Sequence, residues 1–171
     1  MKTKFYAAYG SNLNKIQMKS RCPDSKLVSK IMLPGWSLVF RGVADILINK
    51  NSVLNLGIYE ISDKCERSLD KFEVFPILYK KKILKVDILG KTENVLTYIM
   101  NPKYGFGPPP EKYFKIIAEG FKDWGFENNF LLNALNFSIK NNTNTFFKGS
   151  YWKLSPKTTK NSATKILSQI K

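Results

Sequence analysis

Tyr9-Gly10-Ser11-Asn12-Leu13 joins a strand-like segment to a helix-like one, and the prediction of the fold begins at this junction. Residues 4–9 are apolar enough for a buried strand, and residues 13–21 are expected to form a helix that Ser11 or Asn12 can cap. Such a turn leaves N–H groups of the first helical turn without helical partners, beside the positive end of the helix dipole. It suits a carboxylate or a developing oxyanion, and the alternative is an ordinary capped turn.

Further strands are predicted where apolar residues alternate between turn residues. Pro34-Gly35 separates the first two candidates, and Gly90-Lys91-Thr92 is expected to turn a hairpin between the last two. The strand candidates are the segments 26–33, 36–40, 53–60, 83–89 and 95–100.

Three helices are predicted after the first one. Ser62 opens a short helix that runs to about Phe72. The clearest helix begins at Pro110-Glu111, shows one apolar face and stops at Gly125. Residues 127–139 follow as another helix.

The order of these elements predicts an α+β fold, with strands early and helices late. We expect one domain over residues 1–139 and a Lys-rich C-terminal extension over residues 140–171. Within the extension, Phe146-Phe147 and Tyr151-Trp152 can pack as an edge strand, and residues 163–170 can form a short helix.

The composition excludes several classes of site. The chain has 171 residues and no histidine, which excludes Ser-His-Asp and Cys-His catalysis and His-containing zinc sites. No apolar run reaches the ~18 residues of a membrane span, and no signal-peptide core follows Met1, so we expect a cytoplasmic protein. In that setting Cys22 and Cys65 are expected to be reduced, inert and partly buried.

The net charge of +15 raises nucleic acid as a partner. The cations are nearly all lysines, however, since arginine occurs only at Arg21, Arg41 and Arg67. Nucleic-acid sites usually use arginine forks for bases and phosphates. We therefore favour compositional bias, and keep as an alternative a nucleic-acid role for the stretch after Glu127, which holds seven lysines and no acid.

Four stretches, in order, resemble the γ-glutamylcyclotransferase-like family over roughly residues 4–135. The resemblance implies a small mixed β-barrel with flanking helices and a pocket at one rim. It also implies a cofactor-independent enzyme that releases 5-oxoproline from a small-molecule γ-glutamyl substrate, with no metal and no membrane partner. The four stretches are Tyr9-Gly10-Ser11-Asn12-Leu13, then Leu69-Asp70-Lys71-Phe72-Glu73 with Pro76 and Tyr79, then Tyr98-Ile99-Met100, and finally Pro109-Pro110-Glu111-Lys112-Tyr113.

Glu73 stands at the position of the family's general acid/base. In the implied reaction, the α-amine of a γ-glutamyl group attacks its own γ-carbonyl and expels an amine. One carboxylate can take the proton of the attacking amine and deliver it to the leaving amine. The residues around Glu73 are apolar, which would raise its pKa toward neutrality. Read by pattern alone, Glu73 is a surface residue just past a helix end.

The resemblance also implies substrate-binding residues. The turn from Tyr9 to Leu13 would bind the substrate, and Tyr79, Tyr98 and Tyr113 match tyrosines that line the family's pocket. Arg41 either pairs with a substrate carboxylate or forms a structural ion pair, and the sequence leaves both open.

Val74 departs from the family pattern, which has glycine after the catalytic glutamate. If that glycine serves a positive φ, valine would be strained there, and if it admits substrate, Val74 would narrow the pocket. This departure motivates an alternative function, in which the fold is retained as a catalytically inactive module that binds a small amino-acid-like ligand.

Overall fold

A five-stranded mixed sheet forms the centre of the molecule in the computed structural model, which describes residues 3–171. The spatial order is β2-β3-β1-β5-β4, and every neighbouring pair is antiparallel except β1 and β5. The strands are β1 (Thr3–Ala8), β2 (Lys26–Phe40), β3 (Ala44–Ser62), β4 (Tyr79–Ile88) and β5 (Lys91–Met100).

The α+β class is confirmed, but the predicted barrel does not form as a closed sheet in the part of the chain that the structure describes. β2 and β4 each pair on one side only, so the described sheet is open. The two segments predicted on either side of Pro34-Gly35 form one long strand, β2, in which Gly35 has φ +85° at a register shift. β3 also begins earlier than predicted, because residues 49–51 are exposed and polar and hide the strand pattern.

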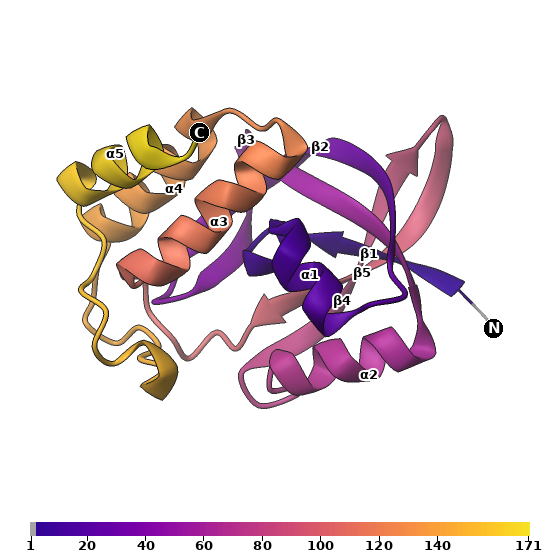
Figure 1. Ribbon diagram of the computed structural model, residues 1–171, viewed down its shortest axis with the longest axis horizontal. Coiled ribbons are helices and arrows are strands. Elements are labelled where there is room, and N and C mark those ends of the chain that lie inside the picture. Colours follow the sequence, from indigo (N-terminus) through magenta and orange to yellow (C-terminus); the bar gives the residue numbers. More distant parts are fainter. Residues whose placement is uncertain (1–2) are drawn as a thin grey trace.

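Within residues 3–171, five α-helices and two 3₁₀ turns surround the sheet (Figure 1). Asn14 caps α1 by accepting the N–H of Gln17, so the cap lies two residues beyond Asn12 and three beyond Ser11, the two predicted positions. Ser62 caps the second helix and Gly125, with φ +65°, ends the third, both as predicted. The elements are η1 (Ser11–Leu13), α1 (Lys15–Arg21), α2 (Asp63–Phe72), α3 (Glu111–Trp124), α4 (Asn128–Lys140), η2 (Ser150–Trp152) and α5 (Lys160–Gln169).

Close packing of α3 on the turn after β1 fixes that turn in place. A Cβ on Gly120 would lie 2.7 Å from the Cβ of Leu13, so only glycine allows this approach. Leu13 is fully buried, and its carbonyl accepts the indole N–H of Trp124 at 2.9 Å. Leu13 therefore anchors the turn in the core.

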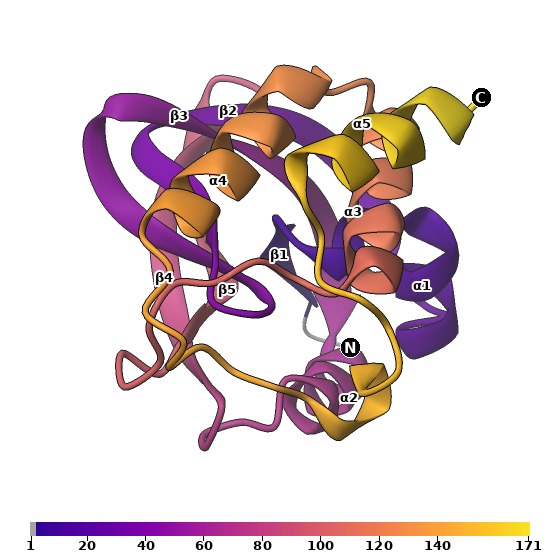
Figure 2. The same ribbon diagram turned by 90° about the vertical axis from the view of Figure 1, so that its left-hand side faces the viewer.

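The C-terminal segment packs against the remainder of the described chain. α5 contacts α3 and α4, and Ala163 on α5 is fully buried (Figure 2). The edge strand predicted around residues 146–152 does not form, since residues 150–152 make η2 instead. No helix among residues 3–171 is long and apolar enough to span a bilayer.

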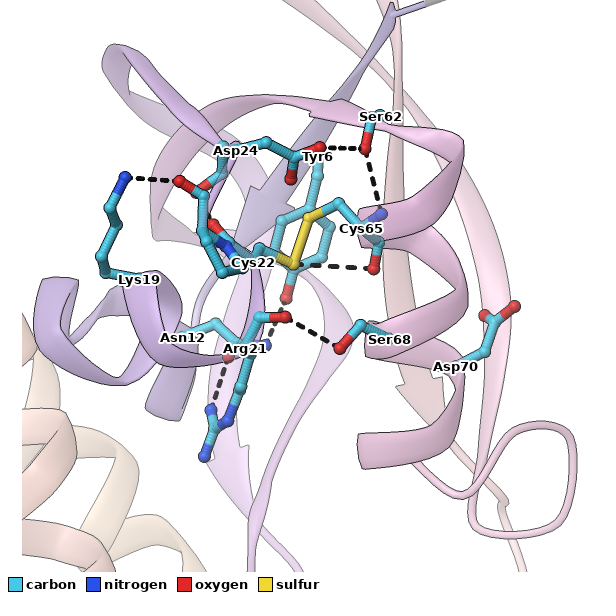
Figure 3. The surroundings of a disulfide bond; sticks show 12 residues. Tyr6, Asn12, Lys19, Arg21, Cys22, Asp24, Ser62, Cys65, Ser68 and Asp70 are labelled. Atoms are coloured by element: carbon cyan, nitrogen blue, oxygen red, sulfur yellow. Dashed lines mark hydrogen bonds between the residues drawn. A yellow bond between two sulfur atoms is a disulfide. The ribbon is translucent and has the colours of Figure 1, made fainter.

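Cys22 and Cys65 form a disulfide, and the expectation that they are reduced is wrong (Figure 3). Cys22 follows the last residue of α1 and Cys65 lies in the first turn of α2, with a Cα–Cα distance of 5.0 Å. The Ser68 hydroxyl donates to the Arg21 carbonyl at 2.8 Å beside it. The bond thus ties together the two helices whose C-terminal ends carry Arg21 and Glu73.

Candidate functional site

One cavity of about 450 Å³ lies where η1, α1, the end of α2 and the C-terminal segment meet. Two charged side chains line it, those of Arg21 and Glu73. The rest of its wall is polar, aromatic or aliphatic, from residues that include Tyr6, Tyr9, Gly10, Ser11, Asn12, Gln17, Phe72, Val74, Leu78, Tyr79, Tyr98, Tyr113, Ile116, Phe147, Ser150, Tyr151 and Trp152.

Glu73 is the C-cap residue of α2, and its partly buried carboxylate faces this cavity. Burial raises the pKa of Glu73 from 4.5 to about 7, while the charge of Arg21 and a hydrogen bond from Asn12 oppose that rise. The Asn12 amide donates to Glu73 Oε1 at 3.2 Å. A carboxyl with a pKa near 7 can both accept and donate a proton at neutral pH.

Asn12 organises the polar side of the cavity. Its Nδ2 donates to the Tyr6 hydroxyl at 2.9 Å, and its Oδ1 accepts from Arg21 at 2.5 Å (Figure 3). The same Nδ2 donates to Glu73. Arg21 also donates to Ser11 Oγ at 3.1 Å. Because Arg21 can only donate, these bonds fix which end of the Asn12 amide faces Glu73.

The polar side of the cavity also includes the backbone of Ser11 and Asn12. Among the hydrogen bonds within residues 3–171, none is donated by the N–H of Ser11 or Asn12. These two groups open the 3₁₀ turn η1, where a first turn has no helical acceptor for them. They are suited to bind a carboxylate or an oxyanion.

The four predicted tyrosines all line the cavity, and their hydroxyls are engaged within the protein. The Tyr9 hydroxyl donates to the Tyr98 carbonyl at 2.6 Å, and the Tyr79 hydroxyl donates to the Ala44 carbonyl at 2.5 Å. Tyr113 accepts the Ala44 N–H at 3.1 Å. Burial raises the pKa of each of the four phenols, so they stay neutral and shape the wall.

Two predicted residues lie outside the cavity lining. Leu13 belongs to the core, as described above. Arg41 pairs with Asp45 at 2.8 Å, donates to the Tyr104 carbonyl at 2.6 Å and stacks on Phe106. Of the two roles that the sequence left open for Arg41, the structural ion pair is the one present.

The cavity lining also contains residues that were not predicted, namely Arg21, Tyr6, Gln17 and the aromatic residues of the C-terminal segment. Gln17 and Arg21 had a signal, because a four-residue spacing on a helix places both on the face nearest the turn, and Arg21 donates to Gln17 at 3.1 Å. The C-terminal aromatics had none, since their place depends on long-range packing.

No group of three or more His, Cys, Asp or Glu side chains that could hold a metal occurs among residues 3–171. Glu73 is the single carboxylate in the cavity lining. The arrangement therefore offers one acid/base group beside an arginine and two free backbone N–H groups.

Val74 has φ +51°, a left-handed conformation that is costly for a β-branched residue. Its side chain is 47% exposed, so little burial is lost on truncation. We expect Val74→Gly to raise the free energy of unfolding by about 1 kcal/mol, measured by urea denaturation, because relief of the strained φ exceeds the added entropy of an unfolded glycine.

Leu89→Gly is the matched control, because Leu89 has φ +53° and lies on a hairpin turn outside the cavity lining. It should give a smaller gain, since leucine is not β-branched. A lower stability of Val74→Gly than of the wild-type chain would contradict the strain at this position.

The comparisons with known proteins identify a family and a shared fold. A family model described as "Gamma-glutamyl cyclotransferase, AIG2-like" matches residues 6–124. No curated protein sequence matches the chain.

Three solved structures share the fold. A structure titled "Gamma-glutamyl cyclotransferase" has a TM-score of 0.70 at 22% identity, covering 98% of this chain and 99% of its own. An uncharacterized protein, loc79017 from Homo sapiens, has a TM-score of 0.67 at 23% identity, covering 97% and 99%. YkqA from Bacillus subtilis has a TM-score of 0.65 at 23% identity, covering 87% of this chain and 57% of its own.

Proposed function

Because the chain belongs to the AIG2-like gamma-glutamyl cyclotransferase family, we propose that it releases 5-oxoproline from a γ-glutamyl compound, with Glu73 as general acid and base. The observation that carries the proposal is the partly buried Glu73 carboxyl, which has a pKa of about 7 and faces a cavity of about 450 Å³.

The reaction is an intramolecular acyl transfer. The α-amine of the γ-glutamyl group attacks the γ-carbonyl carbon, a C–N bond forms to close the five-membered lactam, and the bond to the leaving amine breaks. No water is consumed. Holding the two reacting groups of one molecule together supplies much of the rate advantage, provided that the cavity binds the chain in a folded conformation.

The reaction requires removal of a proton from the α-ammonium group and addition of a proton to the leaving nitrogen, and Glu73 carries out both transfers. The ionised carboxylate accepts a proton from the α-ammonium group, which makes the amine nucleophilic, and the resulting carboxylic acid protonates the departing nitrogen. The regenerated carboxylate then takes the second proton from the ring nitrogen and passes it to the product amine, which leaves as an ammonium ion. The pKa of about 7 makes both forms accessible at neutral pH.

The polar side of the cavity would hold the charged part of the substrate. The N–H groups of Ser11 and Asn12, with the Arg21 guanidinium beside them, are suited to the α-carboxylate. The tyrosine walls, Tyr9, Tyr79, Tyr98 and Tyr113, would pack against the aliphatic part of the glutamyl chain.

The test is turnover of γ-glutamyl dipeptides by the purified protein, with 5-oxoproline and the free amine quantified by mass spectrometry. The proposal expects the two products in equal amounts. Absence of 5-oxoproline from every dipeptide, together with measurable binding, would favour the inactive ligand-binding module that the strained Val74 motivates.

The acid limb of the pH profile provides a further prediction. Since ionised Glu73 starts the reaction, kcat/KM should fall below about pH 7. The positive charge of Arg21 lowers the pKa of Glu73, so Arg21→Met should move this limb to higher pH. The profile of the variant would be measured against wild type over the same buffers. A limb that stays in place would show that Arg21 does not act on the titrating group.

A further inference from the structure

Residues 147–152, here called the aromatic strap, form one wall of the cavity although they lie outside the matched family region. The strap supplies Phe147, Tyr151 and Trp152, separated by Gly149 and Ser150. The match to the family model ends at residue 124, so it does not include this wall.

The strap is held at both ends. Its first residue, Phe147, donates its N–H to the Arg41 carbonyl at 2.9 Å. Beyond its last residue, the Glu111 N–H donates to the Pro156 carbonyl at 2.8 Å, and Thr158 donates its N–H to the Pro109 carbonyl at 2.8 Å. The segment therefore crosses the cavity as a fixed wall.

Trp152, the last residue of the strap, makes two aromatic contacts at the cavity. Its ring meets the Tyr113 ring edge to face, with centroids 5.8 Å apart, and the Tyr151 ring at 4.6 Å. Trp152 is half-buried while Tyr151 is 85% exposed, so the pair presents an aromatic surface that reaches from the cavity to solvent.

The charges of the cavity limit what this surface can accept. Arg21 and Glu73 are both engaged around Asn12, on the side assigned to the glutamyl group. The strap brings no carboxylate, and the lysines within and directly after it, Lys148 and Lys153, would repel an ammonium group. An uncharged apolar group is what this wall fits.

We propose that the aromatic strap binds the leaving group and selects γ-glutamyl amino acids with large apolar or aromatic side chains over those with cationic ones. The inference rests on the proposed function, because it takes the glutamyl part to be held at Asn12 and Glu73. Trp152 acts as a specificity-determining residue, since it contacts the part of the substrate that departs.

The test compares γ-glutamyl-phenylalanine, γ-glutamyl-glycine and γ-glutamyl-lysine. In the last compound the glutamyl group is joined to the α-amine of lysine, so the side chain keeps its ammonium group. Wild type should have the highest kcat/KM for the phenylalanine compound. Trp152→Ala should lower that value about 10-fold more than it lowers the value for the glycine compound. Leu154→Ala is the control, because Leu154 is 93% exposed, lies two residues on and is outside the cavity lining. It should change neither value.

The inference would be overturned if Trp152→Ala lowered kcat/KM by the same factor for the phenylalanine and glycine compounds, or if wild type showed no preference among the three dipeptides. Either result would leave the proposed function standing. Calorimetric binding of the same three dipeptides tests the strap without turnover. Tighter binding of the phenylalanine compound, weakened in Trp152→Ala, supports it even if no 5-oxoproline forms, in which case the proposed function alone fails. Equal affinities for all three dipeptides overturn it.

Discussion

Glu73→Gln is expected to lower 5-oxoproline release by about 10²–10⁴-fold while the protein stays folded. The glutamine amide cannot accept and return a proton, and general acid/base catalysis is worth about this factor. Its Oε1 can still accept the Asn12 amide that now bonds Glu73 at 3.2 Å, so the geometry of the cavity should persist. The measurement is kcat on a γ-glutamyl dipeptide, with circular dichroism to verify the fold.

The same substitution should stabilise the protein at high pH. The pKa of Glu73 is about 7 in the folded state against 4.5 for the free side chain, so between these values the folded state binds more protons. The free energy of unfolding contributed by this group therefore falls as pH rises from 4.5 through 7. Above about pH 8 the ionised Glu73 carboxylate destabilises the folded state by at most about 3 kcal/mol. Solvent around this partly exposed group reduces that destabilisation.

Glu73→Gln should accordingly exceed wild type in stability by about 1–3 kcal/mol above about pH 8, and the difference should shrink toward pH 4.5. Denaturation by urea at both pH values measures it. Glu93→Gln is a suitable control, because Glu93 lies on the β4–β5 hairpin, outside the cavity lining. Unchanged turnover in Glu73→Gln would remove Glu73 from the mechanism.

Loss of the Cys22–Cys65 disulfide is expected to lower the free energy of unfolding by about 2–4 kcal/mol. The bond closes a segment with a sequence separation of 43, and restricting the unfolded chain over such a loop is worth about this amount. The double substitution Cys22→Ala, Cys65→Ala compared with the wild-type chain in urea denaturation measures the effect.

The wild-type protein in reductant is the matched control, and its free energy of unfolding should fall to that of the double variant. The double variant itself should not respond to reductant. Since Cys22 follows Arg21 directly, the loss should also loosen the α1 side of the cavity and raise KM. Two freely reactive thiols in the unreduced protein would contradict the pairing.

Local patterns predicted much of the fold. The caps at Ser62 and Gly125 and the hairpin around Gly90 depend on residues near one another in the chain, and all three are confirmed. The long β2–β3 hairpin was harder to predict, because Gly35 breaks the pattern without breaking the strand. An open sheet cannot be told from a closed one by its strand patterns, since closure is a property of the edges.

The candidate site was predicted where motifs are continuous in sequence and missed where it is assembled from distant segments. Tyr9 to Asn12, Glu73 and three further tyrosines lie around one cavity. Arg41 was ambiguous because an arginine fork fits a substrate carboxylate and Asp45 equally well. The strap residue Trp152 lines the cavity through long-range packing, since Pro156 and Thr158 bond to the start of α3 and the loop before it.

The disulfide shows the limit of arguing from context. Two cysteines 43 positions apart carry no pairing signal, and the absence of a signal-peptide pattern led to the expectation of free thiols. The pairing follows from how α1 and α2 approach each other, with Ser68 bonded to the Arg21 carbonyl.

The most direct measurement of the central claim is product analysis in H₂¹⁸O. Attack by the substrate's own α-amine at the γ-carbonyl, with Glu73 relaying the proton, takes no oxygen from solvent. The proposed mechanism therefore predicts unlabelled 5-oxoproline and an equal amount of free amine. Glutamate carrying ¹⁸O in its γ-carboxyl group would show that water is the nucleophile and would contradict it.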